Sequence, residues 1–270
     1  MKHSDQSCSG GFTLVEMIMV IVITGIIGGM VAVFLQAPIR QYLDVGRRAE
    51  ITDIADTALR RIGRDLRTAL PNSVRVSGAC GGATCYIEFL PTIGGGRYRA
   101  GAGGTGDILD FTAADSSFEV LGTIPPAGNF VVVYNMTSNP ADLETNAYVG
   151  GNRTGYTGTA GSILSFAPKL FPVDSPNHRF YLITTPVTYA CDPVAGTLTR
   201  WRGYAIQAAQ PVALPGGGSS DILANNVSDC SFRYDPLVSP RNGLVSMNLA
   251  ITKDGETVTL YSATHVSNMP

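Results

Sequence analysis

The chain carries little charge and no excess of either sign. Only 15% of its 270 residues are charged, and 19 Lys and Arg face 21 Asp and Glu, for a formal net charge of −2 at pH 7. This balance provides no long-range attraction to nucleic acid or to anionic lipid, so binding to nucleic acid is not expected. The 44% hydrophobic share supplies enough apolar side chains for a core and excludes a wholly disordered chain.

Histidine is also scarce. After residue 3 the chain has only His178 and His265, which is too few for a typical catalytic zinc site. We expect both at surface or edge positions. No nucleophile, base and orienting group stand out together in the sequence, so we expect no enzymatic activity, no cofactor and no metal.

Two further patterns are weak signals for a binding site. Residues 101–106 (GAGGTG) match the G-x-G-x-x-G string of dinucleotide-binding loops, but a strand-like segment follows them where that motif needs a helix. The carboxylate pairs Asp107/Asp110 and Asp142/Glu144 lack the spacing of a calcium loop. Coincidence and solvated loops are the expected explanations.

One long apolar run lies near the start of the chain. Residues 12–35 (FTLVEMIMVIVITGIIGGMVAVFL) contain a single charge, and 24 residues of helix reach ~36 Å, enough to cross a hydrocarbon core of about 30 Å. A cleaved secretory signal has a shorter apolar stretch of ~7–15 residues and a small-x-small cleavage site, whereas residues 35–38 here are LQAP. The run therefore predicts a transmembrane helix over 12–35.

The charge inside this run is Glu16, whose burial in a bilayer costs ~2.5–3.5 kcal/mol on insertion scales. Residues 9–16 (SGGFTLVE) resemble the type IV prepilin signal, a short polar leader ending in Gly followed by Phe-Thr-Leu-x-Glu. The resemblance implies a leader over residues 1–11, cleavage after Gly11 by a membrane prepilin peptidase, and methylation of the new amino terminus at Phe12. The chain is then a substrate of that peptidase.

The resemblance also gives Glu16 a role. Its carboxylate can pair with the α-ammonium of a neighbouring subunit's Phe12 and set the axial register of a filament; snorkelling to the lipid headgroups is the alternative. The basic residues Arg40, Arg47 and Arg48 after the run outnumber Lys2 before it and favour the reverse orientation. The cleavage signal and the distal cysteines require a cytoplasmic amino terminus, so we give them precedence.

Residues 36–70 predict an amphipathic helix that continues the first into the soluble domain. Its apolar positions recur at steps of three and four, and Pro71 places its end near Ala69. The resemblance to pilins implies that the Gly- and Pro-containing stretch from Gly25 to Pro38 melts locally on assembly. An arginine stripe is interleaved with aspartates and is expected to be a solvated helix face: Arg60, Arg61, Arg64 and Arg67.

From residue 71 to 270 the apolar period changes from 3.6 to 2, which indicates a β-rich globular domain. The clearest strand candidates are residues 86–90, 130–134, 179–183, 244–249 and 257–261, with long loops expected around 91–106, 135–162 and 211–220. Strands packed on one long helix make an α+β fold, here a pilin-like one.

Four cysteines remain after the leader, which contains Cys8. An even number in an exported domain suggests disulfides, and four cysteines allow three pairings. Glycines in the loop between Cys80 and Cys85 favour a local bridge, which leaves Cys191 to pair with Cys230. A zinc site is the less favoured alternative, because no second cysteine pair or histidine cluster lies nearby in the sequence.

Softer motifs resemble minor pilins of the mannose-sensitive haemagglutinin (MSHA) pilus system: residues 223–234 (LANNVSDCSFRY), 241–245 (RNGLV), 72–76, 189–191 and 198–201. The resemblance implies a bacterial inner-membrane protein, with a periplasmic carboxy-terminal domain, that later becomes part of a surface pilus. Its implied partners are prepilin peptidase, major and minor pilins, the inner-membrane assembly machinery and membrane lipid. A minor pseudopilin of a type II secretion system is the runner-up. A tip adhesin, with Tyr148 and Tyr156 as exposed loop aromatics, and a membrane-anchored enzyme are further alternatives.

Overall fold

A computed structural model describes residues 11–101, 105–236, 238 and 241–270, so the leader apart from Gly11 lies outside the described residues. The chain forms two compact units, Met1–Ala49 and Glu50–Pro270. One helix, α1 (Leu14–Leu66), contributes to both. It ends three residues earlier than predicted, because the N–H groups of Thr68 and Ala69 turn back to the carbonyls of Asp65 and Leu66 and Ala69 forms a β-bridge with Pro91.

The described part of the first unit consists mainly of the apolar portion of α1. The helix continues through Pro38, and an apolar window within it has a mean hydropathy of 2.8 with none of its residues buried. It is long and apolar enough to cross a membrane. Local melting between Gly25 and Pro38 on assembly stays a prediction.

In the second unit the end of α1 packs on two antiparallel sheets. The predicted apolar stripe is confirmed, since Ile51, Ala55, Ile62 and Leu66 are all fully buried. One sheet has the order β1-β2-β9-β10-β11 and the other β12-β13-β14, and their inward-facing side chains share one core with the helix. The strands are β1 (Arg75–Gly78), β2 (Cys85–Phe89), β9 (Val187–Asp192), β10 (Thr197–Arg202), β11 (Ser219–Asn225), β12 (Val227–Asp235), β13 (Asn242–Lys253) and β14 (Glu256–Ser267).

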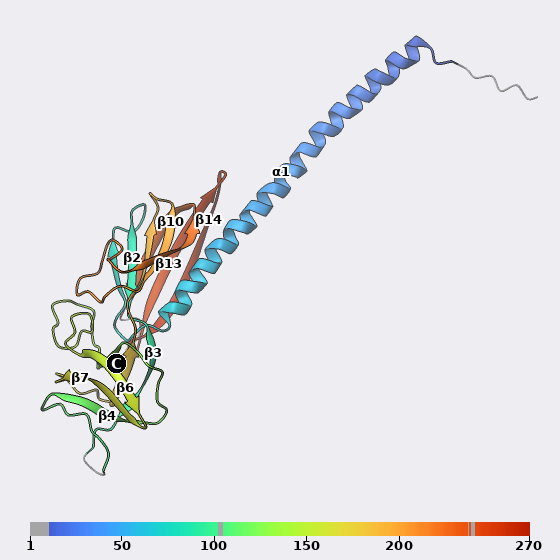
Figure 1. Ribbon diagram of the computed structural model, residues 1–270. Helices are drawn as coiled ribbons and strands as arrows, with labels where there is room; N and C mark the ends of the chain where they lie inside the picture. The colour runs from blue at the N-terminus through green and yellow to red at the C-terminus, as the bar shows by residue number, and fades with distance from the viewer. Residues whose placement is uncertain (1–10, 102–104, 237, 239–240) are drawn as a thin grey trace, which may run out of the picture. The chain divides into compact units, whose positions relative to one another are not determined.

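The remaining six strands close into a small barrel with the order β3-β4-β7-β6-β5-β8. Figure 1 shows the barrel strands grouped at one end of this unit and the two sheets at the other. The barrel strands lie in the sequence between β2 and β9, which are hydrogen-bonded neighbours in the first sheet. The last pair of that ladder is Phe89 with Val187, so the barrel is an insertion between two paired strands. The barrel strands are β3 (Thr92–Tyr98), β4 (Asp115–Leu121), β5 (Phe130–Val133), β6 (Arg153–Ala160), β7 (Ile163–Lys169) and β8 (Arg179–Ile183).

Aromatic side chains fill the barrel. Tyr98, Phe118 and Phe180 are fully buried within it, and the rings of Phe118 and Phe180 lie 4.9 Å apart, centroid to centroid. A third apolar cluster joins Leu70 and Leu90, at the start of the insertion, to barrel residues such as Val132 and Ile183. The barrel is therefore packed on the rest of the unit as well as connected to it.

The α+β fold and the five predicted strands are confirmed, but two predicted loops were wrong. Strand β3 lies within residues 91–106 and strand β6 within 135–162. Three consecutive glycines hide the strand pattern of β3. A Cβ at Gly96 would come within 3.0 Å of the Phe180 ring, so glycine leaves room there for an aromatic core residue.

Candidate functional site

The amino-terminal segment begins with exposed residues and a capped helix. Gly11 and Phe12 are exposed, with Phe12 at 77%, and α1 begins at Leu14. The backbone N–H of Glu16 donates to Oγ1 of Thr13 over 3.3 Å. Thr13 is thus the N-cap and Glu16 the third helical residue, the sequence spacing of a capping box. The local sequence Thr-Leu-Val-Glu therefore fixes where the helix starts, immediately after the expected cleavage point.

The Glu16 side chain is exposed in this unit. Among the described residues, no basic side chain is placed within 4 Å of its carboxylate. A carboxylate at the start of an apolar helix is stabilised by the helix dipole, yet it still lacks a cation that could neutralise it in a low-dielectric surrounding.

The structure contains both predicted disulfides. Cys80–Cys85 links the two ends of the turn between β1 and β2, and Cys191–Cys230 joins β9 of the five-stranded sheet to β12 of the three-stranded sheet. Cys85 and Cys191 are direct partners across β2 and β9. All four cysteines therefore meet at the junction of the two sheets, a proximity that their sequence spacing did not reveal.

A buried ion pair lies where the first sheet meets the barrel, and the sequence analysis missed it. Glu88 on β2 is fully buried, and its oxygens accept from the Arg75 guanidinium at 3.2–3.4 Å. The guanidinium also donates to the carbonyl oxygens of Gln207 and Ala208 at 2.9 and 2.6 Å. The only signal in the sequence was an acid within the apolar strand YIEFL.

An aromatic ring covers the other face of this guanidinium. The Cζ atom of Arg75 lies 3.6 Å from the centre of the Tyr148 ring, a cation–π contact. Tyr148 is 2% exposed, and its hydroxyl donates to the Ser73 carbonyl. The expectation that Tyr148 is an exposed loop aromatic was therefore wrong, and Tyr156 is partly buried against the barrel core. Neither tyrosine therefore supports the alternative of a tip adhesin with exposed loop aromatics.

Burial raises the pKa of the Glu88 carboxyl to about 7, against the opposing effect of Arg75. Because an exposed glutamate has a pKa of 4.5, the folded chain binds more protons than the unfolded chain between these values. We therefore expect the free energy of unfolding to decrease as the pH rises from about 4.5 to 7, by on the order of 3 kcal/mol. Urea denaturation at several pH values, followed by the fluorescence of the single tryptophan, Trp201 on β10, measures this slope.

Replacing Glu88 with glutamine should flatten that slope, because the amide does not titrate. Glu144→Gln is the matched control, since Glu144 is exposed in a loop. An unchanged slope in Glu88→Gln would assign the pH dependence to another group.

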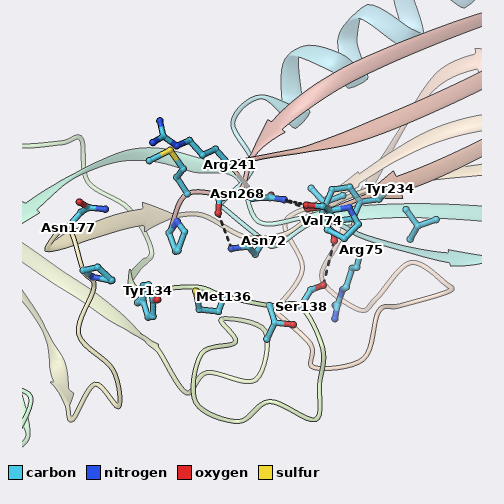
Figure 2. Close-up of a pocket in the computed structure, with 16 residues that line it drawn as sticks. Asn72, Val74, Arg75, Tyr134, Met136, Ser138, Asn177, Tyr234, Arg241 and Asn268 are labelled. Carbon is cyan, nitrogen blue, oxygen red and sulfur yellow. Dashed lines mark hydrogen bonds between the residues drawn. The ribbon is translucent and has the colours of Figure 1, made fainter. Parts of the chain in front are cut away.

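A pocket of about 960 Å³ opens beside Arg75, between the end of the sheets and loops of the barrel. Figure 2 shows Asn268 between Asn72 and Tyr234. Nδ2 of Asn72 donates to the Asn268 carbonyl at 3.4 Å, and the Tyr234 hydroxyl donates to Oδ1 of Asn268 at 3.0 Å. Ser138 donates to the Val74 carbonyl at 3.5 Å. Most of these polar groups that line the pocket are therefore already hydrogen-bonded, and two of the bonds hold Asn268, near the carboxy terminus, to Asn72 and Tyr234.

The other candidate residues have local structural partners. His178 stacks edge-on against Tyr98, with Nδ1 3.5 Å from Asp174, and His265 is exposed on β14. Asp110 and Asp142 accept hydrogen bonds from backbone N–H groups two residues ahead, the geometry of Asx turns. No group of three or more metal-ligating side chains is present in the part of the chain that the structure describes.

The remaining two predictions concern the glycine-rich string and the arginine stripe. Residues 102–104 of the string lie outside the described residues, and residues 108–111 after it do not form the strand that the sequence suggested. The predicted solvated face is supported, because Arg60 pairs with Asp56 at 2.6 Å and Arg61 with Asp65 at 3.5 Å. Asp65 also accepts from Arg200 on β10, so this face helps to fix the helix on the first sheet.

Comparison with known proteins bears on the amino-terminal segment. Residues 6–32 match the family model of the prokaryotic N-terminal methylation motif. No curated protein and no solved structure matches the chain. The chain thus carries the amino-terminal signal of type IV pilin-like proteins and pseudopilins, which implies processing by prepilin peptidase and anchoring by the apolar helix.

Proposed function

We propose that this chain is a minor pilin of a type IV pilus, cut after Gly11, methylated on Phe12 and incorporated at low copy number. The observation that carries the proposal is the start of α1, where the methylation motif opens a helix whose apolar surface is exposed. An apolar helix surface of this kind must be shielded from water. Membrane lipid shields the surface before assembly, and the helices of other pilins shield it in the fibre.

The disulfides support the proposed orientation. Disulfides form and persist in oxidising compartments such as the periplasm, and both bridges lie in the Glu50–Pro270 unit. With this unit in the periplasm, the leader lies in the cytoplasm, where prepilin peptidase acts in the resembled family. The chain then crosses the inner membrane once.

The size of the globular unit supports a minor role. The barrel adds strands β3 to β8 between two paired strands of the first sheet, and this body can supply contacts that start or cap a fibre. We assign the chain to the MSHA system on the resemblance of residues 223–234 and 241–245. A minor pseudopilin of a type II secretion system is the alternative, because pseudopilins carry the same methylation motif.

The processing step has a direct test. We expect Gly11→Val to leave the full precursor in the membrane, because a branched side chain before the cleaved bond obstructs the peptidase. Mass spectrometry of the wild-type chain should show an amino terminus at methylated Phe12. A mature chain that begins elsewhere would contradict the prepilin assignment.

Assembly is tested by isolating fibres from cells that express a tagged copy. A few copies per fibre, together with a major pilin, are the expected result for a minor pilin. Recovery only with type II secretion components would favour the pseudopilin alternative.

A further inference from the structure

Two arginines face each other on the outside of the barrel. Arg97 on β3 and Arg179 on β8 are direct partners in the antiparallel register. Their neighbours Tyr98 and Phe180 are fully buried in the barrel core. Because successive side chains of a strand point to opposite faces, both guanidinium groups point outward on the same surface.

Like charges placed directly opposite on neighbouring strands destabilise a sheet. The acids near this pair are engaged elsewhere, since Glu119 pairs with Arg99 and Asp174 lies beside His178. Within the described residues, no carboxylate is placed in an ion pair with Arg97 or Arg179. The barrel therefore carries two arginines at directly opposed positions without a carboxylate partner among the described residues.

The arginines border a groove of about 470 Å³. Its floor includes the backbone of Gly95 and Gly96, and Thr123 and Tyr181 lie along it. A Cβ at Gly95 would come within 3.0 Å of a carbon of the Tyr181 ring, so the ring lies against this glycine. The Tyr181 hydroxyl itself donates to the Met269 carbonyl at 3.0 Å. The groove thus combines two guanidinium groups, the Tyr181 ring and the Thr123 hydroxyl.

We propose that this groove binds an acidic saccharide through a carboxylate or sulfate group held by Arg97 and Arg179. The planar fork of arginine matches such oxyanions and can bind them in bidentate fashion. A sugar ring can lie in the groove beside Tyr181, and the Thr123 hydroxyl can hydrogen-bond a sugar hydroxyl. Binding also removes the repulsion between the two cations.

Calorimetric titration of the full chain, purified in detergent, tests the proposal with three tetrasaccharides: a galacturonate oligomer, a heparin fragment and neutral maltotetraose. The two acidic probes distinguish carboxylate from sulfate recognition. We expect at least one of them to bind and maltotetraose not to bind. The double variant Arg97→Gln/Arg179→Gln should weaken binding by at least about tenfold, since it removes charge-assisted hydrogen bonds.

Arg202→Gln is the matched control, because it removes one exposed arginine that pairs with Asp221 on the first sheet. Its affinity should stay within about twofold of wild type, as for a surface charge outside the site. Arg97→Lys keeps the charge but loses the fork and should give an intermediate affinity. Equal losses in Arg202→Gln and the double variant would overturn the site.

The ligand class has its own test. If inorganic phosphate or an acidic peptide bound as tightly as the saccharides, the saccharide assignment would be wrong. If neither acidic saccharide bound, the proposal would fail as a whole. None of these outcomes depends on cleavage after Gly11 or on assembly, so they leave the proposed pilin function to its separate tests.

Discussion

Replacing both Cys191 and Cys230 with alanine is expected to lower the free energy of unfolding by about 4 kcal/mol, the chain-entropy value for a closed loop of this length. The bridge closes 39 residues of sequence separation and joins the two sheets, so its loss frees the unfolded chain and removes the covalent link between the sheets. Alanine avoids placing a hydroxyl at positions that are 0% and 1% exposed. Urea denaturation of the mature chain in detergent, followed by Trp201 fluorescence, measures the change.

The double variant Cys80→Ala/Cys85→Ala is the control for this prediction. That bridge closes a separation of only five residues, for which the same model gives about 2 kcal/mol. The Cys191/Cys230 variant should therefore have the lower denaturation midpoint. The reverse order would show that packing around the cysteines, rather than loop closure, determines their contributions.

Glu16→Ala is expected to be cleaved, methylated and inserted in the membrane like the wild-type chain, yet to be nearly absent from assembled fibres. The reason is the charge of the carboxylate, which has no cation partner among the described residues and can pair with the amino terminus of another subunit. The measurement is the amount of tagged chain in isolated fibres relative to the amount of mature chain in the membrane. Crosslinking from position 16 to the amino terminus of a second pilin identifies the partner.

Glu16→Gln separates this role from helix capping. Glutamine at the third helical position supports a capping box as glutamate does, but it carries no charge. If charge pairing sets the register, Glu16→Gln should fail to assemble as Glu16→Ala does. Rescue by glutamine would instead assign the residue to the start of the helix. Glu50→Ala is a suitable control, because Glu50 pairs with Lys253 on the globular surface.

The features that could be predicted from the sequence are those that depend on neighbours along the chain. The segment from Gly11 to Glu16 is recognised as part of the methylation motif. The apolar stripe of α1 follows from apolar residues that recur every three or four positions. The two bridges were predicted correctly because the glycines between Cys80 and Cys85 make a short loop easy to close.

The features that were missed depend on neighbours in space. Strand β3 lacks the usual alternation because its glycines make room for a ring on β8. Glu88 and Tyr148 meet only through Arg75, and 60 residues separate them in the sequence. The opposition of Arg97 and Arg179 likewise exists only once the register of β3 and β8 is known.

The insertion of the barrel between two adjacent strands has a consequence for how this protein can change. Phe89 and Val187 are paired across β2 and β9, so the segment between them leaves and rejoins the sheet at one point. A short hairpin turn in its place would keep the order of the remaining strands but would uncover Leu70 and Arg75, which pack on residues of that segment. The register of the sheet therefore does not constrain the outward-facing residues of the barrel, whereas Tyr148 and the apolar cluster around Leu70 hold the barrel against the rest of the unit.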